Sequence, residues 1–139
     1  MILGVGTDIA EVGRIRESIA RYGDRFLKRV YTEGERSYAM RRADPAERFA
    51  ARFAAKEAGM KAVGTGWRRG VTWLDFEVVN QLSGRPTLRL SGIAREIADS
   101  MGVQRVSLSL THSSAIAFAF VLLENSGPAA SSLSEFPAI

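Results

Sequence analysis

The sequence contains no cysteine, and this absence excludes disulfide bonds and thiolate metal sites. A chain that needs no disulfides suits a reducing compartment. The sequence also lacks an apolar run long enough to span a bilayer, and its N-terminus lacks the basic start and apolar stretch of a signal peptide. We therefore expect a cytoplasmic protein without a membrane segment.

Lysine is scarce as well. Only three of the 19 basic residues are lysine, and the formal net charge is +4. The planar guanidinium of arginine can bind two oxygens of a carboxylate or phosphate at once. An arginine-rich chain could therefore bind nucleic acid, an anionic nucleotide or an acidic protein, and charge alone does not choose among them.

The 139 residues suffice for one domain. Apolar periodicity predicts an α+β fold in which a mostly antiparallel sheet carries helices on one side. We expect the domain to span residues 1–124 and residues 125–139, rich in Ser, Pro and Ala, to form a disordered tail. Strands are predicted over residues 1–9, 71–79, 86–90, 106–111 and 115–123, and helices over 11–22, 26–31, 32–42, 46–63 and 93–101.

The most informative stretch is RFAAKEAGMKAVGTG, residues 52–66. It continues a helix for which Asp44 is the predicted N-cap, Pro45 the first helical residue and Glu47 the reciprocal cap. The 3.6-residue period places five side chains along one face, which we interpret as the apolar, inner face: Phe49, Phe53, Glu57, Met60 and Lys61. Glu57 and Lys61 could simply be an exposed i,i+4 pair. Alternatively, a carboxylate drawn toward the core needs a partner such as a metal ion.

Two further polar residues stand among apolar neighbours. Asp8 ends the first predicted strand, where it could instead cap the following helix. Gly4 and Gly6 precede it without the third glycine of a dinucleotide fingerprint, so we expect them to allow another backbone or a ligand to approach. His112 lies in the tight connection between the last two strands, where it could also be an ordinary turn residue.

Asp8 and Glu57 together suit a hard divalent cation, since Mg²⁺ binds one or two carboxylates plus water and substrate phosphate. Lys61 could neutralise charge on that phosphate. Gly64 and Gly66 could serve as helix C-caps, or their loop amides could contact a phosphate together with nearby cations. The pattern favours phosphoryl-type chemistry.

Four segments sharpen this interpretation: GVGTDIAEVGRI (4–15), RFAAKEAGMKAVGTG (52–66), SGRP (83–86) and VSLSLTHSSAIAFAFVLLE (106–124). Together they resemble the holo-acyl-carrier-protein synthases, small bacterial 4′-phosphopantetheinyl transferases, in order and spacing over about residues 1–124. Ser113 departs from the family, which often has threonine there, and the tail after Glu124 has no counterpart.

The resemblance implies transfer of 4′-phosphopantetheine from coenzyme A to a serine of acyl carrier protein in fatty acid biosynthesis, with release of adenosine 3′,5′-bisphosphate. It also implies a homotrimer with its sites at subunit interfaces. Asp8 and Glu57 would bind Mg²⁺ and Lys61 would face the pyrophosphate, while Glu57, Asp8 or a metal-bound water would take the serine proton. The implied coenzyme A contacts are Arg52, Lys61, Gly64, Gly66, Pro86, His112 and Ser113, and the implied carrier contacts are Arg14 and Arg21.

Helix geometry adds a condition on this site. Arg52 and Glu57 are five residues apart and point about 140° away from each other on one helix. If both contact one coenzyme A, Arg52 must come from a neighbouring subunit. Two alternatives remain open: another Mg²⁺-dependent nucleotide-processing enzyme, and a basic RNA-binding module without catalysis. The strands lack the paired exposed aromatic residues expected of the latter.

Overall fold

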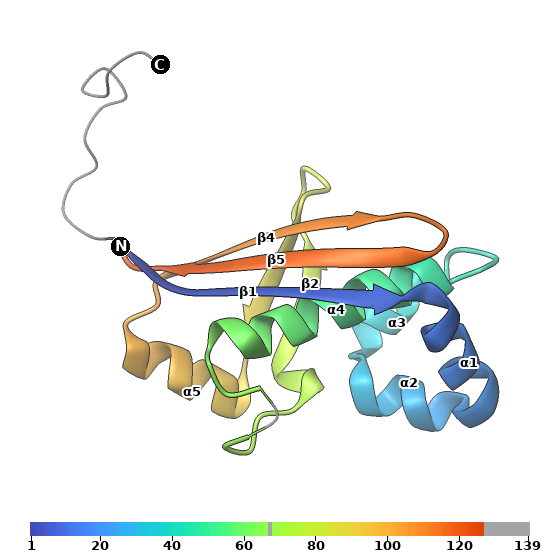
Figure 1. Cartoon of the computed structure of the whole chain (residues 1–139), viewed down its shortest axis with the longest axis horizontal. Helices are drawn as coiled ribbons and strands as arrows, with labels where there is room; N and C mark the ends of the chain where they lie inside the picture. Colours follow the sequence, from blue (N-terminus) through green and yellow to red (C-terminus); the bar gives the residue numbers. More distant parts are fainter. Residues whose placement is uncertain (67, 127–139) are drawn as a thin grey trace, which may run out of the picture.

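A three-stranded antiparallel sheet lies over a layer of helices (Figure 1). The structure, a computed structural model, describes residues 1–66 and 68–126. The strands are β1 (Ile2–Glu11), β2 (Phe76–Asn80), β3 (Pro86–Leu90), β4 (Arg105–His112) and β5 (Ile116–Glu124). The helices are α1 (Val12–Tyr22), α2 (Asp24–Val30), α3 (Glu33–Ala39), α4 (Ala46–Ala62) and α5 (Gly92–Met101), with a 3₁₀ turn, η1, at Trp73–Asp75. The predicted α+β class and element order are confirmed.

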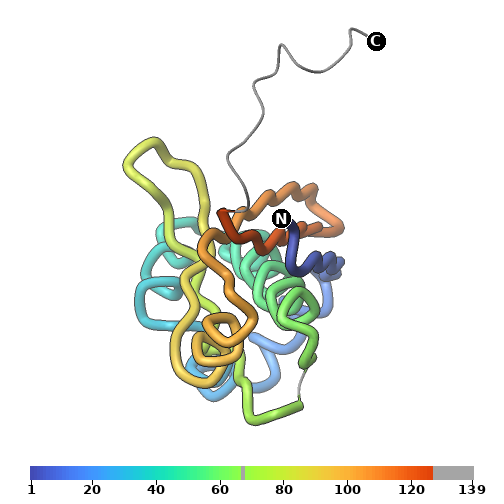
Figure 2. The backbone as a smooth tube through the Cα atoms, turned by 90° about the vertical axis from the view of Figure 1, so that its left-hand side faces the viewer, coloured from blue at the N-terminus to red at the C-terminus, as the bar shows by residue number. Residues whose placement is uncertain are grey.

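Close packing of α4 against the sheet depends on small residues. The strand order is β1-β5-β4, and α4 lies directly under β1 and β5 (Figure 2). A Cβ built on Gly4 would overlap the carbonyl oxygen of Ala62, and one built on Gly6 would overlap that of Ala58. The prediction that these glycines let another backbone approach is confirmed, and that backbone belongs to α4.

Strands β2 and β3 form a separate antiparallel hairpin whose tip projects beyond the sheet (Figures 1 and 2). The predicted third strand matches β3, whereas the prediction that a strand begins at residue 71 is wrong. Residues 73–75 turn instead, with the Asp75 N–H donating to the Thr72 carbonyl at 3.1 Å. Alternation of apolar residues does not distinguish such a turn from the strand that follows it.

Helix α4 is buried on nearly every side, so the prediction of one apolar face is wrong in part. The five side chains predicted to point inward differ in exposure: Phe49 and Met60 are buried, Phe53 and Glu57 half-buried, and Lys61 exposed. Arg52 and Lys56, on another stripe, are 5% and 0% exposed. The sheet, α3 and β2 cover different sides of α4, so a single hydrophobic stripe does not describe the helix.

A buried ion pair connects three elements beneath the sheet. Lys56 Nζ lies 2.6 Å from Glu35 Oε1 and also donates to the carbonyls of Trp73 at 3.1 Å and Phe76 at 2.5 Å. Glu35 completes the predicted capping box with Thr32 and accepts the Val78 N–H at 2.9 Å. Burial lowers the pKa of Lys56, and Glu35 opposes that shift. All three donors of the ammonium are therefore satisfied.

The start of α4 differs from the prediction. The helix begins at Ala46, and the residue before it, Pro45, makes no side-chain cap. Asp44 accepts a long hydrogen bond of 3.4 Å from the Ala46 N–H, while its other oxygen binds Arg16 at 2.7 Å. Glu47, the predicted reciprocal cap, lies 3.7 Å from His112 instead. Asp44 thus divides its two oxygens between the helix terminus and Arg16, and Glu47 does not form the predicted reciprocal cap.

The predicted tail falls largely outside the described residues. Within them, the Asn125 N–H donates to the Met1 carbonyl at 3.1 Å, and the Ser126 N–H donates to Gln104 at 2.5 Å. The boundary at residue 124 stays a prediction. Across the described part of the chain, no helix has the length and apolar character needed to cross a membrane.

Candidate active site

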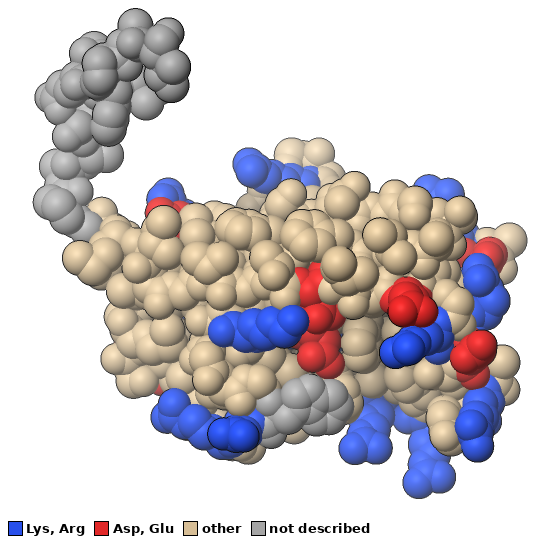
Figure 3. All heavy atoms as spheres, in the orientation of Figure 1, with Lys and Arg blue, Asp and Glu red and all other residues tan. Residues whose placement is uncertain are grey.

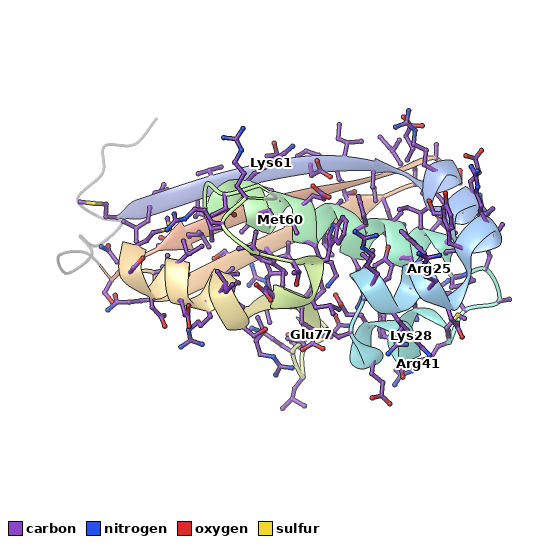
Figure 4. The ribbon with its side chains drawn as sticks, turned by 90° about the horizontal axis from the view of Figure 1, so that it is seen from below. Arg25, Lys28, Arg41, Met60, Lys61 and Glu77 are labelled. Atoms are coloured by element: carbon purple, nitrogen blue, oxygen red, sulfur yellow. The ribbon has the colours of Figure 1, made fainter. Side chains whose placement is uncertain are left out.

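Asp8 and Lys61 meet where strand β1 crosses the end of α4. Lys61 Nζ donates to Asp8 Oδ1 and to the Thr7 carbonyl, both at 3.0 Å. The Asp8 side chain is 17% exposed and that of Lys61 is 53% exposed. Figure 4 shows Lys61 on the side of α4 that faces β1. The half-buried carboxylate therefore faces a positive charge.

Glu57 stands one helical turn before Lys61, so the two side chains are neighbours on one stripe of α4. Its Oε1 accepts a hydrogen bond of 3.1 Å from the indole Nε1 of Trp73. Because Lys61 contacts Asp8, this stripe brings the carboxylates of Asp8 and Glu57 to the same region of the surface. Figure 3 shows acidic atoms grouped beside a basic side chain in the middle of the face crossed by β1.

The chemistry of this donor set fits a hard cation. Carboxylate oxygens are the ligands that Mg²⁺ prefers, and water and substrate phosphate usually complete its shell. Among residues 1–66 and 68–126, no three or more His, Cys, Asp or Glu side chains form a group that could hold a metal ion. The Lys61 ammonium lies on Asp8 where such a cation would bind, and its exposure leaves it room to turn away.

A second, separate feature is a cavity of about 240 Å³ near the N-terminal half of α4. Arg52, Pro86 and His112 line it, as do residues that the sequence reasoning did not select: Tyr38, Arg42, Arg48 and Asn80. Arg48 lies one turn before Arg52 on α4, and this i,i+4 spacing indicates from the sequence that the two side chains are neighbours. The three arginines that line the cavity outnumber its two carboxylates, those of Asp44 and Glu47. The cavity is therefore suitable for an anion.

Tyr38 holds two of these arginines in place. The guanidinium carbon of Arg52 lies 4.0 Å from the ring centroid of Tyr38, and that of Arg48 lies 4.2 Å from it. Hydrogen bonding to Asn80 is the largest cause that lowers the pKa of Tyr38, and the arginines add to it. Burial lowers the pKa of Arg52. Within the described residues, the buried Nε of Arg52 has no hydrogen-bond acceptor, although most buried polar groups are hydrogen-bonded.

Within one chain, the group of Asp8, Glu57 and Lys61 lies apart from the cavity lined by Arg52 and His112. Asp8, Glu57 and Lys61 are not among the residues lining the cavity of Arg52 and His112. Glu57 faces Trp73, whereas Arg52 faces Tyr38. The side chains of α4 therefore diverge as helix geometry predicts.

Other predicted site residues have visible local roles. Gly64, with φ of 80°, ends α4 by donating to the Lys61 carbonyl at 3.0 Å, which is the predicted C-cap role, and Gly66 follows in the same loop with φ of 52°. Ser113 shapes the β4–β5 turn, where its hydroxyl accepts the N–H groups of Ala115 and Ile116, each at 3.2 Å. Their contact with coenzyme A stays a prediction.

The end of the molecule formed by α1 and α2 is basic. The predicted carrier contacts Arg14 and Arg21 are exposed on α1. Helix α2 adds exposed Arg25, Lys28 and Arg29, at an i, i+3, i+4 spacing that the sequence reasoning overlooked. Figure 3 shows basic side chains projecting from this end, and Figure 4 labels Arg25 and Lys28 there. This surface could attract an acidic partner.

Known proteins resemble this chain in sequence and in fold. Residues 4–120 match the 4′-phosphopantetheinyl transferase superfamily. The holo-[acyl-carrier-protein] synthase of Solibacter usitatus is 59% identical over 125 residues, which are 90% of this chain and all of that protein. The structure of the Neisseria meningitidis synthase is similar with a TM-score of 0.82 and 34% identity, over 90% of this chain and 100% of that chain. The Bacillus anthracis synthase in complex with CoA (3′,5′-ADP) has a TM-score of 0.73 and 41% identity, over 90% and 98% of the respective chains.

Proposed function

Because this chain belongs to the holo-acyl-carrier-protein synthase family of the 4′-phosphopantetheinyl transferase superfamily, we propose that it transfers 4′-phosphopantetheine from coenzyme A to a serine of apo-acyl carrier protein, releasing adenosine 3′,5′-bisphosphate. The observation that carries this proposal is the convergence of Asp8, Glu57 and Lys61 beside β1. The coenzyme A ligand of the Bacillus anthracis relative supports the donor substrate.

Asp8 and Glu57 would hold one Mg²⁺. When bound, this ion would neutralise charge on the pyrophosphate and stabilise the charge that develops on the transferred phosphoryl group. Lys61, which contacts Asp8 at 3.0 Å, would turn its ammonium toward the departing phosphate. The exposure of the Lys61 side chain leaves room for this movement.

The reaction replaces one phosphorus–oxygen bond with another. The carrier serine hydroxyl attacks the phosphorus that bears the pantetheine, the bond to adenosine 3′,5′-bisphosphate breaks, and the serine proton passes to a base. Glu57 and Asp8 are this chain's carboxylates near that point. Oε1 of Glu57 already accepts a hydrogen bond from the Trp73 indole, and Oδ1 of Asp8 accepts one from Lys61.

The cavity of Arg52 and His112 would bind the nucleotide end of coenzyme A, with Pro86 near the adenine. Its three arginines and the unsatisfied Nε of Arg52 support a phosphate there. Since the metal carboxylates of the same chain lie elsewhere, one coenzyme A would contact the cavity of one subunit and Asp8, Glu57 and Lys61 of the next.

A homotrimer, implied by the family resemblance, would provide this shared site. The sheet face opposite α4 supports an interface because it is apolar and exposed: Val5, Ile9, Ile116 and Phe120 are 49%, 60%, 45% and 37% exposed. Side chains of β1 and β5 pair across this face, as in the register of Val5 with Leu122 and Ile9 with Phe118. A patch of this kind typically marks a protein–protein contact.

The basic end at Arg14 and Arg21 would receive the acidic carrier protein. The exposed charges on α1 and α2 support this docking surface. For the location, we propose the cytoplasm, since a chain without cysteine suits a reducing compartment.

The proposed function is tested by incubating the protein with coenzyme A, Mg²⁺ and an apo-acyl carrier protein and then weighing the carrier. The proposal expects a mass gain equal to one 4′-phosphopantetheine group, and no gain when the target serine of the carrier is replaced by alanine. An unchanged carrier mass under conditions in which an established synthase modifies it would refute the proposal.

A further inference from the structure

Trp73 is linked to two consecutive residues of α4 through different groups. Its indole Nε1 donates to Glu57 Oε1 at 3.1 Å, while its carbonyl accepts from Lys56 Nζ at 3.1 Å. Lys56 is itself fixed by the fully buried pair with Glu35 at 2.6 Å. The backbone of Trp73 is thus anchored in the core at the point from which its ring reaches Glu57.

The ring of Trp73 is also held from its sides. Its centroid lies 6.2 Å from that of Phe53, which precedes Glu57 by one turn of α4. The guanidinium of Arg29, on α2, lies 5.8 Å from the same ring. Since packing and hydrogen bonds restrict the indole, the direction in which it presents its N–H is also restricted.

We infer that Trp73 is a positioning residue that orients the carboxylate of Glu57 for a divalent cation, an inference that rests on the proposed metal-binding role of Glu57. A glutamate on a half-exposed helix stripe can adopt several rotamers, and a fixed donor on one oxygen selects among them. Donors in the outer shell of a metal site commonly act in this way, and losing one typically costs about 10–100-fold in metal affinity or activity.

Trp73→Phe tests the inference, because phenylalanine keeps an aromatic ring beside Phe53 and Arg29 but lacks the N–H. The full-length chain is titrated with Mn²⁺ in the presence of coenzyme A, and free Mn²⁺ is measured by electron paramagnetic resonance. We expect the Mn²⁺ dissociation constant to rise about tenfold, with the turnover number largely recovered at saturating metal and little change in the unfolding temperature.

Phe53→Leu is the matched control, since it changes packing on the same ring and leaves the indole N–H. It should lower the unfolding temperature without weakening Mn²⁺ binding. If Phe53→Leu weakened Mn²⁺ binding as much as Trp73→Phe, or if folded Trp73→Phe bound Mn²⁺ like the wild type, the positioning role would be refuted.

A measurement on the unmutated side chain covers the case in which Trp73→Phe does not fold. In a Trp67→Phe background, Trp73 is the only tryptophan, so its indole gives one ¹H–¹⁵N signal. That signal should shift on Mg²⁺ addition and should not respond in Glu57→Gln; an indole signal indifferent to Mg²⁺ would overturn the inference. Wild-type Mn²⁺ affinity in both Asp8→Asn and Glu57→Gln would instead refute the metal assignment itself.

Discussion

At the level of single residues, the proposed metal site needs two carboxylates that come from different elements. Asp8 occupies an inward-facing position within β1. Glu57 lies on the same stripe of α4 as Lys61, whose ammonium contacts Asp8. Their types and positions could be predicted from the sequence, because isolated carboxylates among apolar residues are unusual. Their partners could not be predicted, since contacts such as Trp73 to Glu57 depend on how the chain folds back after α4.

Removing either carboxylate should nearly abolish transfer. For Asp8→Ala and Glu57→Ala we expect activity to fall more than about 100-fold, since changing even an outer partner of a metal ligand costs about 10–100-fold. Circular dichroism should show an intact fold. Glu96→Ala, an exposed carboxylate on α5, is the control and should keep its activity. Near-normal turnover of either site variant at ordinary Mg²⁺ would argue against the shared metal.

At the scale of elements, α4 organises the molecule more completely than its sequence suggests. The periodicity predicted the helix itself and the strands around it, and the glycines of β1 correctly indicated a close backbone approach. The inner face was misassigned because the core surrounds α4 on several sides. The full burial of Lys56 could not be predicted from the sequence. A charged side chain is buried only where the fold supplies partners such as Glu35, and the sequence does not show which residues meet.

Lys56→Met should therefore be strongly destabilising. The change leaves the carboxylate of Glu35 buried without its cation, which typically costs about 3–5 kcal/mol of the free energy of unfolding. Urea unfolding followed by circular dichroism measures this loss. Lys28→Met, at an exposed lysine on α2, should change the same quantity by less than about 0.5 kcal/mol. A loss below about 1 kcal/mol for Lys56→Met would show that the pair contributes little.

The basic surface of α1 makes a prediction about the carrier protein. Arg14→Glu should raise the KM for the carrier roughly three- to thirtyfold, because an exposed pair contributes up to about 1 kcal/mol and charge reversal adds repulsion. The KM for coenzyme A should hardly change. Steady-state kinetics at several ionic strengths measure both values, and the effect should weaken as salt screens the charges. Arg95→Glu on α5 is the control, and equal effects on both substrates would contradict this docking surface.

At the scale of the whole molecule, the two halves of the proposed site lie on separate parts of one chain. The angle between Arg52 and Glu57 could be predicted from helix geometry alone. The cavity that Arg52 lines could not, because it needs Tyr38 on α3, Pro86 on β3 and His112 on β4 to converge. The apolar outer face of the sheet is a further feature that only the strand register reveals.

Mixing two inactive variants, Glu57→Ala and Arg52→Ala, after reversible dissociation shows whether one site is shared between two subunits. Each variant alone should be inactive, since every site lacks one residue. In mixed oligomers, some interfaces combine an intact Glu57 with an intact Arg52, so we expect activity to return, with its level following the mixing ratio. If each site were built within one chain, every site would stay defective, and a mixture shown to contain mixed oligomers would remain inactive.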